Sequence, residues 1–432
     1  MDTPAPTQTL RILGLAVVLG VLAAIGAAAL LWLVNHGQEW LFVDLPDAWG
    51  MDEAPWWWAA VLLLIGAGLV ALTKRMPGHT GAGPLTGFHF DDPLSMVPSV
   101  LCAALATLIF GLALGPEAPL IVLGSAIGAI AGRNADPQVR KVMMFLGGAA
   151  AIGAVLGNPF IAGFMILEFV AMGMVPALLI APVMLALGSS YVVQIGIWNL
   201  PGLASSGLSV SGLPAYVSIQ PWDLAAGLLV GIIAGAVGVA ARQGGLLFDR
   251  FSSKRITAGL FAAAAITALV LLIAQQGFDI AQNQILFSGE DGMGQLVDQT
   301  SISIVLVILV GKGIAYAVAL GGGFRGGPIF PATFLGLAAG VLVALVLPLQ
   351  SDSLSAMAAA GIAAAAAAML RLPATAALLG AVLIAGAGGA IAPFAIIGAT
   401  IGFVLRIVAD AKLLKTPPIE DAQLPATAAT PD

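Results

Sequence analysis

Charged side chains are scarce in this chain. Lys, Arg, Asp and Glu together make up 9% of the 432 residues, whereas hydrophobic residues make up 60% and the mean hydropathy is +1.04. A soluble domain normally carries about a quarter of its residues as charged side chains. The shortage of charge excludes an ordinary soluble domain and predicts an all-α, polytopic membrane protein. The 16 Lys and Arg residues form no basic cluster, so we expect no nucleic-acid partner.

Cysteine and histidine are also rare. The single cysteine, Cys102, excludes an intramolecular disulfide and a cysteine-ligated metal centre. The three histidines form no His-Glu-x-x-His pattern, and the sequence contains no Gly-x-Ser-x-Gly nucleophile motif. We therefore expect neither an enzyme nor a bound cofactor or metal.

Apolar runs and the positions of basic residues predict the topology. The run from Ile12 to Val34 is longer than the hydrophobic part of a signal peptide and can span a bilayer. The loops His36–Pro55 and Gln276–Ser301 hold acids but no Lys or Arg, so we expect them outside. The basic residues of the other loops then place both termini in the cytoplasm. We expect a tail at 1–10, a transmembrane domain at 11–410 and a disordered tail at 411–432.

Two short segments share one glycine and proline spacing. Gly115-x3-Pro119-x4-Gly124-x3-Gly128 recurs as Gly327-x3-Pro331-x4-Gly336-x3-Gly340. Interrupted apolar segments at corresponding places in two halves of a membrane protein indicate a substrate site made by broken helices. We therefore expect two inverted repeats, at about 11–200 and 222–410, that contain broken and re-entrant helices.

Glu117 is the acid of the first segment, between Pro116 and Pro119. Proline is tolerated in the first turn of a helix, so a helix can begin here with its free N–H groups and positive dipole end directed at the preceding loop. Such an end attracts anions. A carboxylate of the chain can occupy that position and be displaced or protonated when an anion binds. A simple helix cap is the alternative role, but a buried acid in a membrane is costly without a task.

The second segment has glycines instead of an acid. The run from Gly321 to Gly327 has so little side-chain bulk that its backbone can approach a ligand closely, and the helix after Pro331 offers its amino end to that ligand. Arg325 adds a positive charge, which either attracts an anion or serves structure by pairing with a carboxylate or reaching an interface. Lys312 is also embedded in apolar sequence, and a role as a structural or interfacial charge is favoured for it.

These segments resemble the signatures of the CLC family of chloride channels and chloride/proton antiporters. Leu114 to Gly128 is similar to the family's Gly-x-Glu-x-Pro signature, and Gly326 to Gly340 is similar to its Gly-Gly-x-Phe-x-Pro signature. Asn158 to Gly163 and Arg371 to Pro373 are similar to two further segments of the family. The combination is closest to a divergent bacterial branch of ion-transport proteins.

The resemblance implies a CLC-like inverted-repeat fold, a homodimer in the bacterial inner membrane and transport of small inorganic anions, chloride before others. It implies that Glu117 is the external gate. The residues it implies for anion binding are Gly115, Ala118, Thr80, Arg325, Gly327, Ile329 and Phe330. Gly78 to Pro84 takes the place of the family's Gly-Ser-Gly-Ile-Pro motif, and in it Ala82 is as good a match as Thr80 to the position that binds the anion. Ile329 stands where the family has phenylalanine. No tyrosine lies in the last hundred residues to match the family's late pore tyrosine.

Coupling to protons depends on a second acid. The family's antiporters use an inward-facing glutamate, and Glu168 lies about one residue short of that register. We expect proton-coupled exchange with Glu168 on the proton path. An uncoupled anion channel and a fluoride exporter are the alternatives. A cation-coupled secondary transporter is an alternative of another class, although two helix N-termini favour an anion.

Overall fold

The computed structural model of the chain describes residues 6–51, 54–78, 81, 83–198 and 209–413. The described residues are mostly helical and form no named strand. The first half contains α1 (Pro6–Glu39), α2 (Leu45–Ala48), α3 (Trp58–Thr73), α4 (Val97–Ile109), α5 (Glu117–Ala131), α6 (Pro137–Val155), α7 (Pro159–Ala171) and α8 (Ile180–Trp198). The second half contains α9 (Pro221–Ser252), α10 (Ile256–Phe278), α11 (Met293–Val297), α12 (Ile302–Gly321), α13 (Ile329–Val346), α14 (Ser353–Leu370), α15 (Pro373–Val382) and α16 (Ala392–Lys412).

Many of the helices are suited to a membrane. Within the described ranges, nine helices are long and apolar enough to cross one. Other apolar helices are shorter, among them α5 with 15 residues and α7 with 13. Proline lies within the first turn of α5, α7 and α13, where it costs no helical hydrogen bond. The prediction of an all-α membrane fold with broken helices is therefore confirmed.

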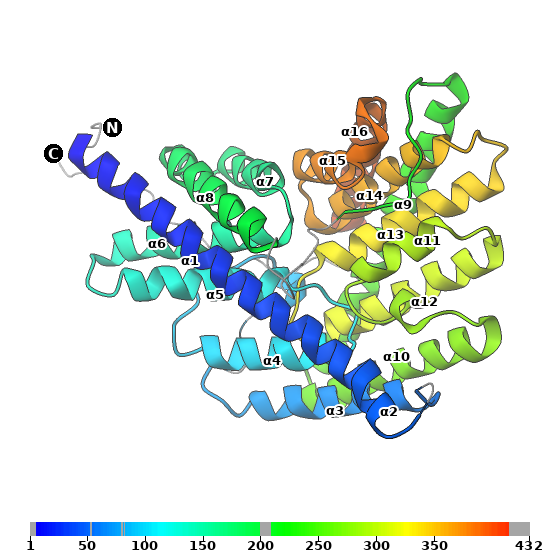
Figure 1. Cartoon of the computed structure of the whole chain (residues 1–432), viewed down its shortest axis with the longest axis horizontal. Helices are drawn as coiled ribbons and strands as arrows, with labels where there is room; N and C mark the ends of the chain where they lie inside the picture. The colour runs from blue at the N-terminus through cyan, green and yellow to red at the C-terminus, as the bar shows by residue number, and fades with distance from the viewer. Residues whose placement is uncertain (1–5, 52–53, 79–80, 82, 199–208, 414–432) are drawn as a thin grey trace.

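The two halves repeat the same pattern of neighbours. α5 packs on α6 as α13 packs on α14, and α1 packs on α8 as α9 packs on α16. Across the halves, α3 contacts α10 and α7 contacts α15, so equivalent helices meet each other. Figure 1 shows α5 to α8 on one side of the molecule and α12 to α16 on the other. This arrangement places the central loops of both repeats between the two halves.

Glycines of the repeated spacing let helices approach closely. A Cβ atom on Gly124 would overlap the carbonyl of Gly147 on α6, and one on Gly336 would overlap the carbonyl of Gly361 on α14. Small residues at helix crossings allow this backbone contact in membrane proteins. The later glycines of the sequence repeat therefore serve helix packing, while only its first glycine lies at the central loops.

Helices α1 and α16 lie at the two ends of the described chain. α1 begins at Pro6 and continues to Glu39, so it is longer than the apolar run Ile12–Val34. Helix continues into the residues expected to form the N-terminal tail at 1–10. α16 ends at Lys412, and residues 414–432, nearly all of the predicted C-terminal tail, lie outside the described residues.

We predict that Gly124→Ala and Gly336→Ala each destabilise the protein, because the added methyl group meets backbone that cannot rotate away. Overpacking of this kind costs about 1–3 kcal/mol. The melting temperature of the purified protein in detergent measures the effect. Gly14→Ala on α1 is the control, since nothing lies within 4 Å of a Cβ at that position. Equal melting temperatures for Gly124→Ala, Gly14→Ala and the unmodified protein would contradict this account of the helix contact.

Candidate anion site between the two repeats

The first glycines of the two segments pair with each other. Gly115 and Gly327 form an antiparallel bridge, in which Gly115 N–H donates to the Gly327 carbonyl at 2.8 Å and Gly327 N–H donates to the Gly115 carbonyl at 2.5 Å. These residues hold equivalent positions in the sequence repeat. The bridge therefore brings the N-termini of α5 and α13 to one place, as the spacing predicts.

The Glu117 carboxylate fills the space between these helix ends. Glu117 is the first residue of α5 and is 0% exposed. Its Oε1 accepts a hydrogen bond from Phe330 N–H in the first turn of α13 at 2.8 Å. Its Oε2 is buried with no hydrogen-bond partner in the described part of the chain. The carboxylate thus takes the position in which a small anion would satisfy the same N–H group.

Glycine is required on both sides of this carboxylate. A Cβ on Gly115 or on Gly327 would overlap the carboxyl group of Glu117. The absence of side chains therefore creates the space that an acid or an anion occupies. Of the run that was predicted to approach a ligand, Gly327 thus lies against the Glu117 carboxylate.

Two fully buried residues of α12 support the second helix end. Tyr316 donates from its hydroxyl to the Pro328 carbonyl at 2.7 Å, directly before α13. Lys312 donates from Nζ to the carbonyls of Leu286 and, at 3.0 Å, of Phe287, and its Nζ lies 5.0 Å from the ring centroid of Phe334. Lys312 therefore has the structural contacts that the sequence favoured. The sequence did not predict this role for Tyr316. The only feature of the sequence that points to it is an isolated hydroxyl group on the helix before the second segment.

Arg325 joins the loops of the two halves. Its guanidinium donates to the carbonyl of Gly81 in the first half at 2.8 Å, and to those of Gly323 and Phe324 at 3.2 and 3.0 Å. Arg325 also lines a pocket of about 30 Å³ together with Ala118, so its charge lies beside the start of α5. Thr80 and Ala82, the two candidates for the anion-binding position of the Gly78–Pro84 motif, lie outside the described residues.

A second pocket adjoins Pro116, the residue before Glu117. It has a volume of about 130 Å³, and we call it the Glu290 pocket. Its polar lining consists of Asn35, Gln38, Gln194, Ser288, Glu290 and Asp291. Burial, Asp291 and Glu117 together raise the pKa of Glu290 to about 8. Glu290 therefore carries a proton at neutral pH and becomes negative when the pH rises above that value. The sequence showed only an acidic loop here.

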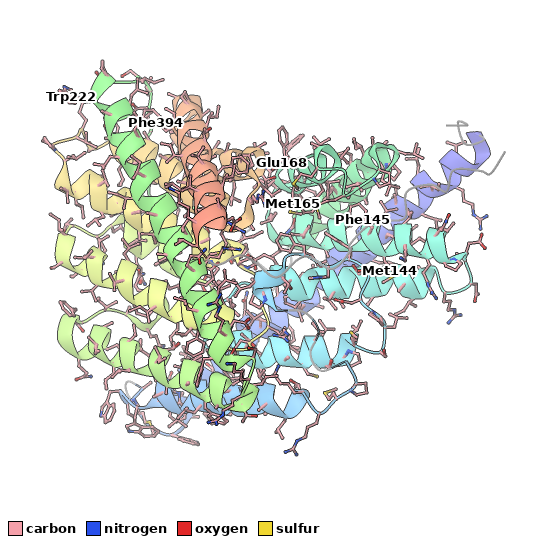
Figure 2. The ribbon with its side chains drawn as sticks, turned by 180° about the vertical axis from the view of Figure 1, so that it is seen from behind. Met144, Phe145, Met165, Glu168, Trp222 and Phe394 are labelled. Atoms are coloured by element: carbon pink, nitrogen blue, oxygen red, sulfur yellow. The ribbon has the colours of Figure 1, made fainter. Side chains whose placement is uncertain are left out.

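Glu168 lies at a different helix end. It belongs to α7 and lines a cavity of about 930 Å³ between the halves, which is also lined by Lys141, Arg242, Arg371 and Arg406. Its carboxylate accepts N–H bonds from Ala374 and Thr375, both at 2.8 Å, and a bond from the Thr375 hydroxyl. Figure 2 shows Glu168 on α7 where this helix meets the second half. Glu168 thus caps α15, and the structure does not bring it to Glu117.

The described residues contain no group of three His, Cys, Asp or Glu side chains that could hold a metal ion. The donors gathered between the repeats are instead backbone N–H groups and cationic side chains. N–H groups at helix ends bind anions rather than cations. The geometry therefore favours an anion as the ligand of this site.

The sequence is similar to those of known ion-transport proteins. The family model described as "Voltage gated chloride channel" matches residues 82–385. The "Putative ion-transport protein YfeO" of Escherichia coli (strain SMS-3-5 / SECEC) is 28% identical over 352 residues, which cover 78% of this chain and 80% of that protein. The protein of the same name from Salmonella typhimurium (strain LT2) is 28% identical over 356 residues, which cover 78% of this chain and 81% of that one.

Solved structures share the fold. The structure of a slow cyanobacterial Cl⁻/H⁺ antiporter matches with a TM-score of 0.76 at 19% identity, over 93% of this chain and 96% of that one. A CLC-type fluoride/proton antiporter matches with a TM-score of 0.63 at 20% identity, over the same shares of both chains. The predicted CLC-like fold is therefore confirmed. Because the family model matches well over half of the 432 residues, this protein belongs to the CLC family of voltage-gated chloride channels and related ion transporters.

Proposed function

We propose that the protein exchanges small inorganic anions, with chloride as the main substrate, for protons across the membrane. The observation that carries this proposal is the Glu117 carboxylate on the N-terminus of α13, hydrogen-bonded to Phe330 N–H. An acid in this position can leave its N–H partner when it takes up a proton, and an anion can then replace it. Anion binding and proton binding would thus be linked at one site.

The remaining parts of the site are consistent with an anion substrate. Arg325 supplies a positive charge beside Ala118, and Gly327 leaves room for an ion near the first turn of α13. The structural relatives include one named as a Cl⁻/H⁺ antiporter and one named as a fluoride/proton antiporter. Fluoride export is therefore the second candidate within the same class. Two N-termini at one site argue against a cation-coupled transporter.

We further propose a homodimer in the bacterial inner membrane with both termini in the cytoplasm. The acidic loops His36–Pro55 and Gln276–Ser301 would then lie outside, and the cavity lined by Lys141 and Arg242 would open to the cytoplasm. In this orientation the Glu290 pocket lies on the outer side of Glu117. Cysteine cross-linking and labelling from each side of the membrane would test the dimer and the orientation.

Flux from purified protein in liposomes tests the transport class. Chloride, fluoride and nitrate should be compared while the internal pH is recorded in the same assay. Proton movement driven by a chloride gradient would support exchange, whereas chloride movement without protons would identify an uncoupled channel. Absence of anion movement in an oriented, folded preparation would overturn the proposed function.

The first prediction concerns the gate. Glu117→Gln keeps the size of the side chain but cannot ionise, so it should abolish proton movement and remove the response of chloride flux to acid. Parallel recordings of chloride and protons from the same liposomes measure both effects. Glu168→Gln is a useful comparison because Glu168 is also a helix-capping carboxylate. If proton coupling persists in Glu117→Gln, Glu117 is not the gating residue.

The second prediction concerns Arg325. Arg325→Gln should weaken chloride binding by about 1–2 kcal/mol, because a positive charge near the site is lost. Titration calorimetry measures the binding, and the loss should shrink at high ionic strength if the site is open to water. Arg325→Lys keeps the charge and should recover most of the affinity, while Arg250→Gln on the exposed part of α9 should change nothing. Equal affinity in Arg325→Gln and the unmodified protein would assign Arg325 to structure alone.

The third prediction concerns Glu290. Because burial and neighbouring acids raise the pKa of Glu290 to about 8, a negative charge appears next to the approach to Glu117 as the pH rises through that value. Chloride flux should fall over this range, and Glu290→Gln should reduce the fall. Asp298, an exposed acid of the same loop that does not line the Glu290 pocket, provides the control variant Asp298→Asn. If Glu290→Gln and the unmodified protein give the same alkaline pH profile, Glu290 does not control access.

A further inference from the structure

The inward side of Glu117 has a second acid besides Glu168. Asp92 belongs to the segment between the short 3₁₀ helix Pro84–Thr86 and α4. It lines the pocket of about 30 Å³ that also contains Ala118 and Pro119 of α5, together with Arg325 and Gly326. Ala118 directly follows Glu117, so this pocket reaches to within one residue of the gating carboxylate. We call it the Asp92 pocket.

The hydrogen bonds of the two acids differ. Both carboxylate oxygens of Glu168 accept bonds at the start of α15, where Leu372 has no side-chain acceptor to offer. Helix capping therefore accounts for an acid at this position of the apolar helix α7. By contrast, no hydrogen bond joins the half-buried Asp92 carboxylate to another described residue. Asp92 can therefore exchange a proton without breaking a structural contact.

The surroundings of Asp92 favour proton uptake. Burial raises the pKa of Asp92, His89 opposes that effect, and Asp91 adds to it. The charged groups around the pocket are His89 and Asp91 on the same segment and Arg325 from the loop before α13, while α4 and α5 contribute apolar residues to it. A carboxyl group whose pKa lies above its usual range takes up a proton nearer to neutral pH. A pocket of this volume is large enough for a water molecule.

We propose that Asp92 is the inward proton acceptor of the exchanger and passes its proton to Glu117 through water in the Asp92 pocket. In this step an O–H bond of the Asp92 carboxyl group breaks and an O–H bond of the Glu117 carboxyl group forms, with water carrying the proton between them. Asp92 then returns to the ionised form and takes the next proton from the cytoplasm. The inference depends on the proposed exchange of anions for protons, and Glu168 is the competing acceptor.

Liposomes loaded with chloride provide the test, with chloride efflux and proton uptake recorded together. Asp92→Asn should retain chloride movement and lose proton movement by about 100-fold, the scale of a missing proton-transfer group. Asp92→Glu restores a carboxyl group and should restore coupling. Asp91→Asn is the matched control, because Asp91 is the exposed neighbour and does not line the pocket. Glu168→Gln should remain coupled at the ratio of the unmodified protein.

The outcomes separate this inference from the proposed function. If Asp92→Asn moves protons at the unmodified ratio, Asp92 is not the acceptor, although exchange itself stands. Loss of coupling in Glu168→Gln with intact chloride movement would assign the path to Glu168 and overturn the role of Asp92. An unmodified protein that moves chloride without any protons would overturn the exchange and this inference together. Size-exclusion profiles and melting temperatures of the variants show whether each is folded.

Discussion

The hydrogen bond from Phe330 N–H to the Glu117 carboxylate is the interaction on which the central structure depends. A helix that begins inside an apolar protein leaves N–H groups that need acceptors, because an unpaired buried N–H group is costly. α13 begins in such a place, and Glu117 comes from the other repeat to satisfy it. The paired glycines Gly115 and Gly327 leave the necessary space, and Tyr316 holds the carbonyl next to the helix end.

A second helix of the second repeat is also capped at its N-terminus by a carboxylate from the first repeat. Asn158 caps α7 with its own side chain, which accepts from Phe160 N–H at 2.9 Å. At the equivalent start of α15 the residue is Leu372, which cannot accept a hydrogen bond, and Glu168 of α7 reaches across to do so. Two carboxylates of the first half thus satisfy helix ends of the second half. They differ in their remaining bonds. Both oxygens of Glu168 accept hydrogen bonds, whereas the buried Oε2 of Glu117 has no hydrogen-bond partner among the described residues. This difference favours Glu117 as the group that moves.

The sequence predicted much of this architecture for physical reasons. Apolar runs identify membrane helices, proline marks their first turns, and the repeated glycine spacing predicts that two loops meet at Gly115 and Gly327. The burial of Glu117 follows from its place in the repeat. The later glycines of that spacing were harder to interpret, because a glycine beside a ligand and a glycine at a helix crossing look the same in a sequence. The structure assigns Gly124 and Gly336 to helix crossings.

Contacts between distant segments could not be predicted in the same way. Nothing near Glu168 indicates that its partners are Ala374 and Thr375, more than 200 residues later. For Arg325 the sequence left an anion, a carboxylate or an interface as possible partners. It did not indicate that the guanidinium also bonds to the backbone carbonyl of Gly81 in the other half. Asp92 and Glu290 lie in loops whose burial depends on tertiary packing. The amino-acid composition of these loops therefore did not predict the pockets that the two acids line.

The central claim is that Glu117 and a small anion compete for the N-terminus of α13. Crystals of Glu117→Ala soaked in bromide test it directly, because anomalous scattering locates the ion. The account predicts a bromide within hydrogen-bond distance of Phe330 N–H in Glu117→Ala, and none there in the unmodified protein while Glu117 holds that N–H group. An empty position in Glu117→Ala, or a bromide there beside an undisplaced Glu117, would contradict it.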